Sequence, residues 1–389
     1  RALPCQRTES GLAVLLRAGS LSVQPIALRE KAREAASPFS YTGKALETPF
    51  YTIGFDRAGR IKQIYDRQAR RETVRPEGRL NGFYTAEDRP LFWDAWDIDP
   101  YYRAHVRPVE ALESRELAAD GPLFLAIRST WKVGRASRLT QDMIVYAHTR
   151  RIDFQTRVDW REERTLLKTG FALDIHTAQI RAEIQFGHVF RNTHQNTSWD
   201  RAKFEACAHK WVDVSEGDYG VALLNDCKYG YDTLDGMVSL TLLRSPRCPD
   251  ERADIGMHEF TYALLPHAGA FSVETVVREA YALNAPLTVA AGPAGESGQA
   301  HALDFCRVNN PHVIVTAVKK AEDDQATVVR LYEAGNTRGE VVMSFGRPVK
   351  KVYACNLMEE TGESLKLRGD DVEFGIAPFE IKTLKVYFR

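Results

Sequence analysis

The sequence predicts an all-β protein, with a large antiparallel β-supersandwich followed by a small C-terminal β-sandwich. Short runs of β-branched and aromatic residues recur along most of the 389 residues, and turn residues separate many of them. Helical periodicity is scarce, and we expect only two short helices, at 27–36 and 276–283. A stretch rich in glycine, alanine and proline at 286–300 interrupts the strand pattern and predicts a domain boundary.

Residues 1–45 are expected to form a partial N-terminal β segment and a linker. They begin with arginine and soon reach the apolar stretch Leu12–Leu16, so we expect further polypeptide upstream. Residues 46–285 are expected to form the large sandwich domain. The clearest strand, Ile152–Trp160, alternates apolar and polar side chains as a half-buried strand does. Asp56–Gly59 is typical of a hairpin connection. Further strands are expected at 50–55, 123–131, 182–187, 238–243 and 259–265.

Residues 286–389 are expected to form the small sandwich domain, because six short strand candidates follow one another there. These candidates lie at 312–319, 327–333, 341–345, 349–355, 372–376 and 379–388. No internal repeat is found.

Composition excludes several classes of protein. Hydrophobic residues make up 44% and charged residues 27%, which is ordinary for a globular protein. Basic and acidic residues number 52 each, so no net field favours nucleic acid or an anionic membrane. No apolar run is long enough to span a bilayer. The six cysteines are scattered, which favours reduced thiols and a cytoplasmic location.

Residues 89–102, with the sequence RPLFWDAWDIDPYY, mix aromatic rings with carboxylates. Rings such as Trp93 and Trp96 can cover the C–H faces of a polyhydroxylated ligand, while Asp94 and Asp97 accept its hydroxyls. A rim in which the aspartates cap turns explains the same residues equally well.

Two other segments carry polar side chains next to predicted strands. Residues 191–197 form a polar run that includes His194, although asparagines and threonines that satisfy the backbone of a long turn explain it too. Residues 225–232 place Lys228, Tyr229, Tyr231 and Asp232 after an apolar run, where a hairpin with solvated charges is the alternative.

The histidine spacing predicts no metal site. Ten histidines are present, but they form no pattern of ligands with the cysteines or acids, and no nucleotide-binding or nucleophile-elbow motif occurs.

Three longer segments together resemble glycoside hydrolase family 38, the α-mannosidases, and specifically its cytosolic-type branch. The resemblance extends from about residue 45 to the end of the chain. It lies in RPLFWDAWDIDPYY at 89–102, in EIQFGHVFRNTHQNTSWDRAKFEACAHKWVDVSEGDYGVALLNDCKYGYD at 183–232 and in LLRSPRCPDERADIGMHEFTYALLPH at 242–267. The tail segments HVIVTAVKKAEDDQATVVRLYE and APFEIKTLKVYF are similar to the terminal sandwich of that family.

The resemblance implies the C-terminal β portion of such an enzyme, with a galactose-mutarotase-like supersandwich and without the catalytic barrel. It implies retaining hydrolysis, which uses two carboxyl groups. The zinc and the catalytic residues are expected in the missing catalytic domain, so neither a catalytic residue nor a cofactor is assigned to this chain. Expected partners are the upstream barrel and a mannose-containing oligosaccharide, while homo-oligomerisation is left open. Nine candidates for the rim of the substrate pocket are Tyr84, Asp94, Trp96, Asp97, His194, Lys228, Tyr229, Tyr231 and Asp232.

Two other functions stay open at this point. A non-catalytic carbohydrate-binding or scaffolding module would also account for the aromatic segments. A sugar isomerase of the mutarotase kind, using a histidine and a carboxylate, is a third hypothesis.

Overall fold

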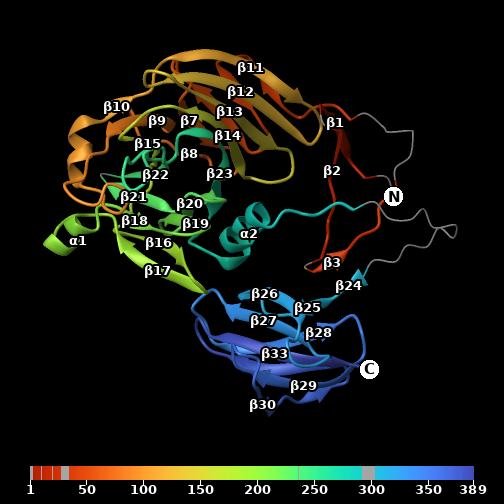
Figure 1. Ribbon diagram of the computed structural model, residues 1–389. Coiled ribbons are helices and arrows are strands. Elements are labelled where there is room, and N and C mark those ends of the chain that lie inside the picture. Colours follow the sequence, from red (N-terminus) through yellow and green to blue (C-terminus); the bar gives the residue numbers. More distant parts are fainter. Residues whose placement is uncertain (1–2, 10, 20, 28–34, 235, 291–302) are drawn as a thin grey trace.

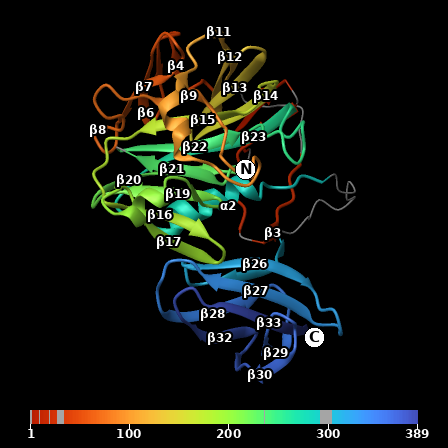
Figure 2. The same cartoon turned by 60° about the vertical axis from the view of Figure 1, so that its left-hand side comes forward.

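The computed structural model describes residues 3–9, 11–19, 21–27, 35–234, 236–290 and 303–389. It confirms the predicted fold class, since antiparallel sheets form both a large sandwich and a smaller one. The small C-terminal sandwich lies at one end of the large sandwich in both views (Figure 1, Figure 2).

One sheet of the large sandwich has eleven strands, and nine of them follow the order β18-β21-β22-β15-β9-β7-β6-β5-β4. The two others, β10 and β8, pair with β9 and β7. The strands are β4 (Ser40–Tyr41), β5 (Ala45–Glu47), β6 (Tyr51–Phe55), β7 (Ile61–Asp66), β8 (Arg71–Glu72), β9 (Leu80–Glu87), β10 (Arg107–Pro108), β15 (Thr165–Ala172), β18 (Ala206–Cys207), β21 (Gly230–Leu234) and β22 (Met237–Leu243).

The facing sheet has nine strands in the order β11-β12-β13-β14-β23-β20-β19-β16-β17. These are β11 (Leu112–Asp120), β12 (Phe124–Val133), β13 (Ser137–Tyr146), β14 (Ile152–Trp160), β16 (Gln179–Ile184), β17 (Gly187–Asn192), β19 (Trp211–Ser215), β20 (Tyr219–Asn225) and β23 (Gly256–Ala268). Apolar side chains of the two sheets, such as Phe154 and Phe171, share one core. Burial of this apolar area is the main force that holds the sheets together.

Most expected strands are confirmed. Strand β14 has the predicted limits, and its apolar residues point into the core. Strands β6 and β7 form the predicted hairpin around Asp56–Gly59. The single strand expected at 182–187 is wrong: β16 ends at Ile184, and this residue pairs with Gly187 across a two-residue turn. Ile184 and Gly187 face the same side of the sheet although they are three positions apart, so the alternation of a single strand is broken at this turn.

Helices are few, as predicted. A π-helical turn, η2 (Val273–Val277), continues into α2 (Arg278–Asn284), which confirms a helix at the predicted place. The described residues contain two other helical segments, the 3₁₀ helix η1 (Pro100–His105) and α1 (Ser198–Ala202). The helix expected at 27–36 falls largely on 28–34, outside the described residues. Every helix in the described part of the chain is too short or too polar to cross a lipid bilayer.

The C-terminal sandwich consists of a four-stranded and a five-stranded sheet that enclose a second core. The four-stranded sheet contains β25 (Cys306–Val308), β28 (Gly339–Phe345), β32 (Asp371–Ile376) and β31 (Leu367–Arg368). The five-stranded sheet contains β26 (Val313–Lys320), β27 (Thr327–Glu333), β33 (Ile381–Phe388), β29 (Val349–Cys355) and β30 (Thr361–Ser364). All six strand candidates in this region are confirmed.

Two small ribbons complete the described strands. They are β1 (Cys5–Thr8) with β2 (Gly11–Val14), and β3 (Ser22–Val23) with β24 (Leu303–Asp304). Most of the boundary predicted at 286–300 lies outside the described residues, and the predicted domain limits stay predictions.

The two sandwiches meet through an aromatic contact around His188 of β17. The imidazole ring lies 5.1 Å from the ring of Phe271 in the large sandwich and 5.1 Å from that of Phe379 in the small one. Its pKa is lowered from 6.5, first by burial and then by the positive charge of Arg181. Glu333 and Asp213 oppose this shift.

This arrangement predicts a loss of stability on acidification. Because the folded pKa of His188 lies below its unfolded value, the unfolded chain binds more protons as the pH falls through 6.5. We expect the thermal unfolding temperature to be lower at about pH 5.5 than at about pH 7.5. The variant His188→Phe should lose part of this pH dependence. The exposed His148 provides the control, because His148→Phe should leave the pH profile unchanged. An unaltered profile in His188→Phe would contradict the prediction.

Candidate functional site

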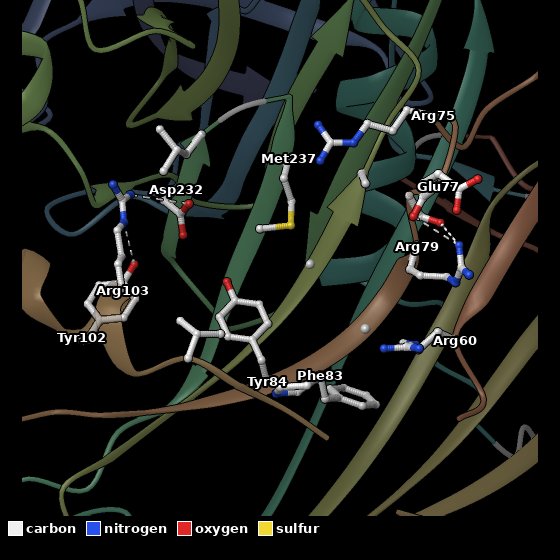
Figure 3. A pocket seen from close by; sticks show the side chains of 17 residues that line it. Arg60, Arg75, Glu77, Arg79, Phe83, Tyr84, Tyr102, Arg103, Asp232 and Met237 are labelled. Atoms are coloured by element: carbon white, nitrogen blue, oxygen red, sulfur yellow. Dashed lines mark hydrogen bonds and ion pairs between the residues drawn. The ribbon is translucent and has the colours of Figure 1, made fainter. Parts of the chain in front are cut away.

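A cavity of about 520 Å³ opens on the outer face of the eleven-stranded sheet. Its floor comes from β9, β15, β21 and β22, and its walls from residues 75–79 and 102–108. Figure 3 shows three arginines and Glu77 on one side and Tyr102, Arg103 and Asp232 on the other, with Tyr84 and Met237 between them. This size is within the usual range for a small-molecule site.

Strand alternation puts the polar side chains on this outer face. Phe83, Phe171 and Tyr231 point into the core, so their neighbours along the strands point outward. In the sheet register, Lys168 lies opposite Tyr84 on β9.

A buried charged cluster lies at one end of the cavity. The Lys168 side chain is fully buried, and its Nζ atom contacts Asp232 Oδ2 at 2.5 Å and also Glu205. Tyr102 Oη donates to Glu205 Oε1 at 2.5 Å. Arg103 Nη2 lies 3.7 Å from Asp232 Oδ1 and donates to a backbone carbonyl at 2.8 Å. The cluster therefore joins η1, the segment after α1 and the sheet.

Asp232 is 6% exposed, and burial raises its pKa, with Glu205 adding to the shift and Lys168 opposing it. Burial likewise raises the pKa of Tyr84, and the nearby charge of Asp232 adds to this. At neutral pH, Tyr84 is therefore a neutral hydroxyl donor. Asp232 and Tyr84 line the cavity, where they can form hydrogen bonds with the hydroxyls of a ligand.

The aromatic loop, residues 89–99, projects its rings into solvent. Trp93 is 75% and Trp96 87% exposed, beside the exposed Leu91 and Phe92. Asp94 serves to anchor the loop, because its Oδ1 pairs with Arg164 Nη1 at 2.8 Å and its Oδ2 accepts from the Arg247 amide at 2.5 Å. The carbonyl of Asp97 accepts from Arg244 Nη2 at 2.6 Å.

His194 and Tyr231 line a smaller cavity of about 110 Å³, to which Asp232 also belongs. His194 Nδ1 lies 3.6 Å from Asp200 Oδ2, and Asp200 and Thr197 form the capping box of α1. Much of the polar run at 191–197 therefore builds a turn and a helix start. Tyr231 is almost fully buried, and its ring packs in the core.

Lys228 and Tyr229 line neither of these two cavities. Lys228 Nζ lies 4.5 Å above the Phe260 ring, and the half-exposed Tyr229 packs against His209 with the ring centroids 5.3 Å apart and the rings tilted by 41°. The structure thus brings Tyr84, His194, Tyr231 and Asp232 around two adjoining cavities. The aromatic loop and the pair Lys228 and Tyr229 lie outside their linings.

Several residues of this site were not found from the sequence. They include Arg60, Arg75 and Arg79 on one wall, and Lys168 and Glu205 in the charged cluster. A lysine inside the otherwise apolar run TLLKTGFA is a signal that could have revealed Lys168, since an unpaired buried charge is costly.

Zinc does not fit the residues that are described. Across those ranges, no group of three or more His, Cys, Asp or Glu side chains is arranged to hold a metal ion. The location of zinc in a separate catalytic domain stays a prediction.

Comparison with known proteins relates both sandwiches to one family. Residues 46–252 match the profile described as "Glycosyl hydrolases family 38 C-terminal domain", and residues 312–384 match "Glycosyl hydrolases family 38 C-terminal beta sandwich domain". The chain is 38% identical over 354 residues to alpha-mannosidase G of Dictyostelium discoideum, covering 87% of this chain and 32% of that protein. It is 36% identical over 345 residues to human alpha-mannosidase 2C1, covering 87% of this chain and 33% of that protein.

The chain thus spans about a third of the length of these curated relatives. Among solved structures, an alpha-mannosidase from Enterococcus faecalis V583 superposes with a TM-score of 0.76 at 17% identity. The superposition covers 92% of this chain and 43% of the other. At that level of identity, the similarity supports a shared fold.

Proposed function

Because the chain belongs to glycosyl hydrolase family 38, we propose that it forms the C-terminal β portion of an α-mannosidase that hydrolyses terminal α-mannosides with retention. Its role there is to support the catalytic domain and to line the rim of the substrate pocket. The similarity to relatives named alpha-mannosidases over 87% of this chain supports the proposal. A cytoplasmic location is part of it, since the six cysteines are free thiols.

The aromatic loop is the main feature that supports a role of this chain in holding the catalytic domain. Arg244 donates to the carbonyl of Asp97 and Arg164 pairs with the Asp94 carboxylate. The side chains of Leu91, Phe92, Trp93 and Trp96 stay exposed. Contiguous exposed apolar surface of this kind marks interaction sites. We assign the catalytic domain of the same enzyme as its partner, and the polar groups beside the loop as candidates for the rim.

The bond-breaking carboxyl groups belong, in this proposal, to the catalytic domain. Retaining hydrolysis needs two carboxyl groups about 5 to 5.5 Å apart that face the substrate. Asp232 and Glu205 lie close together, but both contact the ammonium group of the fully buried Lys168. Both carboxylates are thus ion-pair partners of Lys168, and Arg103 lies 3.7 Å from Asp232, which suits the cluster to a structural role.

Activity assays test the proposal that the catalytic groups lie in the catalytic domain and not in this chain. With an aryl α-mannoside and added zinc, we expect no turnover by the 389-residue chain. A chimera in which this chain replaces the matching third of the Dictyostelium enzyme should regain turnover that the truncated enzyme lacks. Robust turnover by the chain alone, or an inactive but folded chimera, would count against the proposal.

Substitutions in the aromatic loop test the docking role. In the chimera, we expect Trp93→Ala with Trp96→Ala to weaken the contact and lower activity about tenfold or more, since large aromatic rings contribute most to such interfaces. Met358→Ser is the control, because Met358 is equally exposed at 78% but lies in the C-terminal sandwich. Equal activity of the two variants would show that the loop does not contact the catalytic domain.

The exposure of Trp96 also favours a second function, that of a non-catalytic carbohydrate-binding module. Calorimetry of the chain with mannose and short α-mannosides distinguishes this carbohydrate-binding function from the docking role. Saturable binding that is lost in Trp96→Ala supports the module, whereas absence of heat supports the docking role.

A further inference from the structure

We propose that the hairpin formed by β16 and β17 couples the small sandwich to the 110 Å³ cavity, so that contacts between the sandwiches hold the cavity wall that carries His194. The inference concerns this chain itself and does not depend on the proposed mannosidase role. Three observations support it: the tip of the hairpin interlocks with the small sandwich, the hairpin has limited support from its own sheet, and its far end lines the cavity.

The tip of the hairpin and a turn of the small sandwich fit into each other. Phe186, in the turn between β16 and β17, packs edge-to-face on Tyr332 of the small sandwich, with the ring centroids 5.6 Å apart. In the opposite direction, Phe379 of the small sandwich packs against His188 at 5.1 Å and lies over Gly187. A Cβ atom at position 187 would lie 2.8 Å from Phe379 Cδ1, so the Phe379 ring occupies the space that a side chain would need.

Both phenylalanines of this contact have a left-handed backbone conformation. The φ angle is 55° at Phe186 and 56° at Phe379. Bulky residues rarely adopt this region, and surrounding contacts must hold them there. The Phe379 amide donates to Glu333 Oε2 at 3.0 Å, and the Glu333 side chain is fully buried, so the turn of the small sandwich is firmly held. Two aromatic residues kept in such conformations indicate a specific contact between the sandwiches.

The hairpin lies at the edge of the nine-stranded sheet and has limited support from it. β17 is the edge strand, and both views show it next to the small sandwich (Figure 1, Figure 2). In the register, β16 meets β17 at six residue pairs but meets the next strand, β19, at two. Glu183 extends this attachment through Lys210, whose Nζ atom lies 2.9 Å from Glu183 Oε1. Because a two-stranded hairpin is only marginally stable by itself, the contact at the tip contributes to holding it in place.

The far end of β17 forms part of the cavity wall. Residues that line the cavity include four from this strand and the turn after it, namely Phe190, Arg191, Asn192 and His194. Asn192 Nδ2 donates to Asp200 Oδ1 at 2.9 Å, and Asp200 belongs to the capping box of α1, so the position of β17 also sets that of the turn and of α1. A displacement at the tip therefore moves the cavity wall, because β17 is one continuous strand of six residues.

Other contacts keep the two sandwiches together when the contact at the tip is lost. Trp211 and Val276 of the large sandwich share an apolar cluster with Tyr332 and Ala334 of the small one. Variants of the hairpin tip should therefore stay folded, so the coupling can be measured in the whole chain.

Hydrogen exchange of the 389-residue chain tests this coupling with the variant Gly187→Ala. The added methyl group would meet the Phe379 ring and push the tip away from the small sandwich. We expect the amides of residues 191–197 to exchange about tenfold or more faster than in the wild type, while those of β12 and β13 exchange as before. Gly375→Ala is the matched control that should leave residues 191–197 unchanged, because a Cβ atom there would meet only Glu340 Oε1, at 3.7 Å.

A second variant, Phe379→Asn, removes the ring and introduces a residue that tolerates the left-handed conformation. It should also raise the exchange rates of residues 191–197, and it tests the coupling even if Gly187→Ala does not fold. When the two substitutions are combined, the added methyl group no longer meets the ring. The double variant should therefore exchange like Phe379→Asn alone.

Each of the following results would overturn the proposal: unchanged exchange of residues 191–197 in both single variants, faster exchange confined to residues 185–188, equal acceleration in β12 and β13, or effects of the two substitutions that multiply in the double variant.

Discussion

Replacing Lys168 by methionine is expected to lower the free energy of unfolding by about 3–5 kcal/mol. The Lys168 ammonium is fully buried between the carboxylates of Asp232 and Glu205. Methionine has a similar shape, so packing changes little, but two buried anions lose their shared cation. The cost is therefore electrostatic, since an uncompensated buried charge is far less stable than a paired one.

Chemical denaturation followed by circular dichroism measures this loss. Arg157→Met is the control: Arg157 pairs with Glu259 in the same sandwich, but the two side chains are 66% and 71% exposed. A surface pair of that kind contributes about 0–1 kcal/mol. If Lys168→Met were as mild as Arg157→Met, the charged cluster would have no structural role.

The pH dependence of Lys168→Met provides a second criterion. The pKa of Asp232 is already raised by burial, and removing Lys168 removes a cation that opposes this shift. When a folded pKa lies above the unfolded value, stability falls as the pH rises through that interval. We therefore expect the destabilisation to be smaller at about pH 4.5 than at about pH 7, since protonation of Asp232 removes the unpaired charge.

Replacing Arg244 by alanine is expected to cost about 3 kcal/mol and to release the aromatic loop. Arg244 Nε contacts Asp88 Oδ2 at 2.6 Å, and Nη2 donates to the carbonyl of Asp97 at 2.6 Å. Asp88 is 3% exposed, and burial raises its pKa, so without Arg244 this carboxylate lacks its main counter-charge. One side chain thus stabilises both a buried acid and the backbone of the loop.

Hydrogen exchange separates the local effect from the global one. In Arg244→Ala, the exchange rates of the amides of residues 89–99 should rise more than those of amides elsewhere in the large sandwich. Arg244→Lys should be intermediate, because lysine keeps the charge but cannot bond two groups as a planar fork does. Arg161→Ala is the control, since Arg161 pairs with Asp159 at the surface. Unchanged exchange in the loop would mean that Arg164 and Asp94 hold it without Arg244.

The aromatic loop shows which features of a site can be predicted from a short segment of sequence and which cannot. Its mixture of tryptophans and aspartates predicted either a sugar-binding wall or a rim with capped turns. The contacts of Asp94 with Arg164 and the Arg247 amide give that acid a structural role, which the segment alone did not reveal. The exposure of Trp96 still agrees with either a docking surface or a sugar-binding one.

The all-β class, most strands of both sandwiches and the family resemblance could all be predicted from local sequence patterns. Strand periodicity and turn chemistry depend on residues within a few positions of one another, so a linear pattern contains them. The folded chain was needed to reveal that Lys168, Glu205 and Asp232 form one cluster and that Arg60 and Gly82 border the same cavity. Those contacts join distant segments through the register of β21, β22, β15 and β9, and register is set by how whole strands pack.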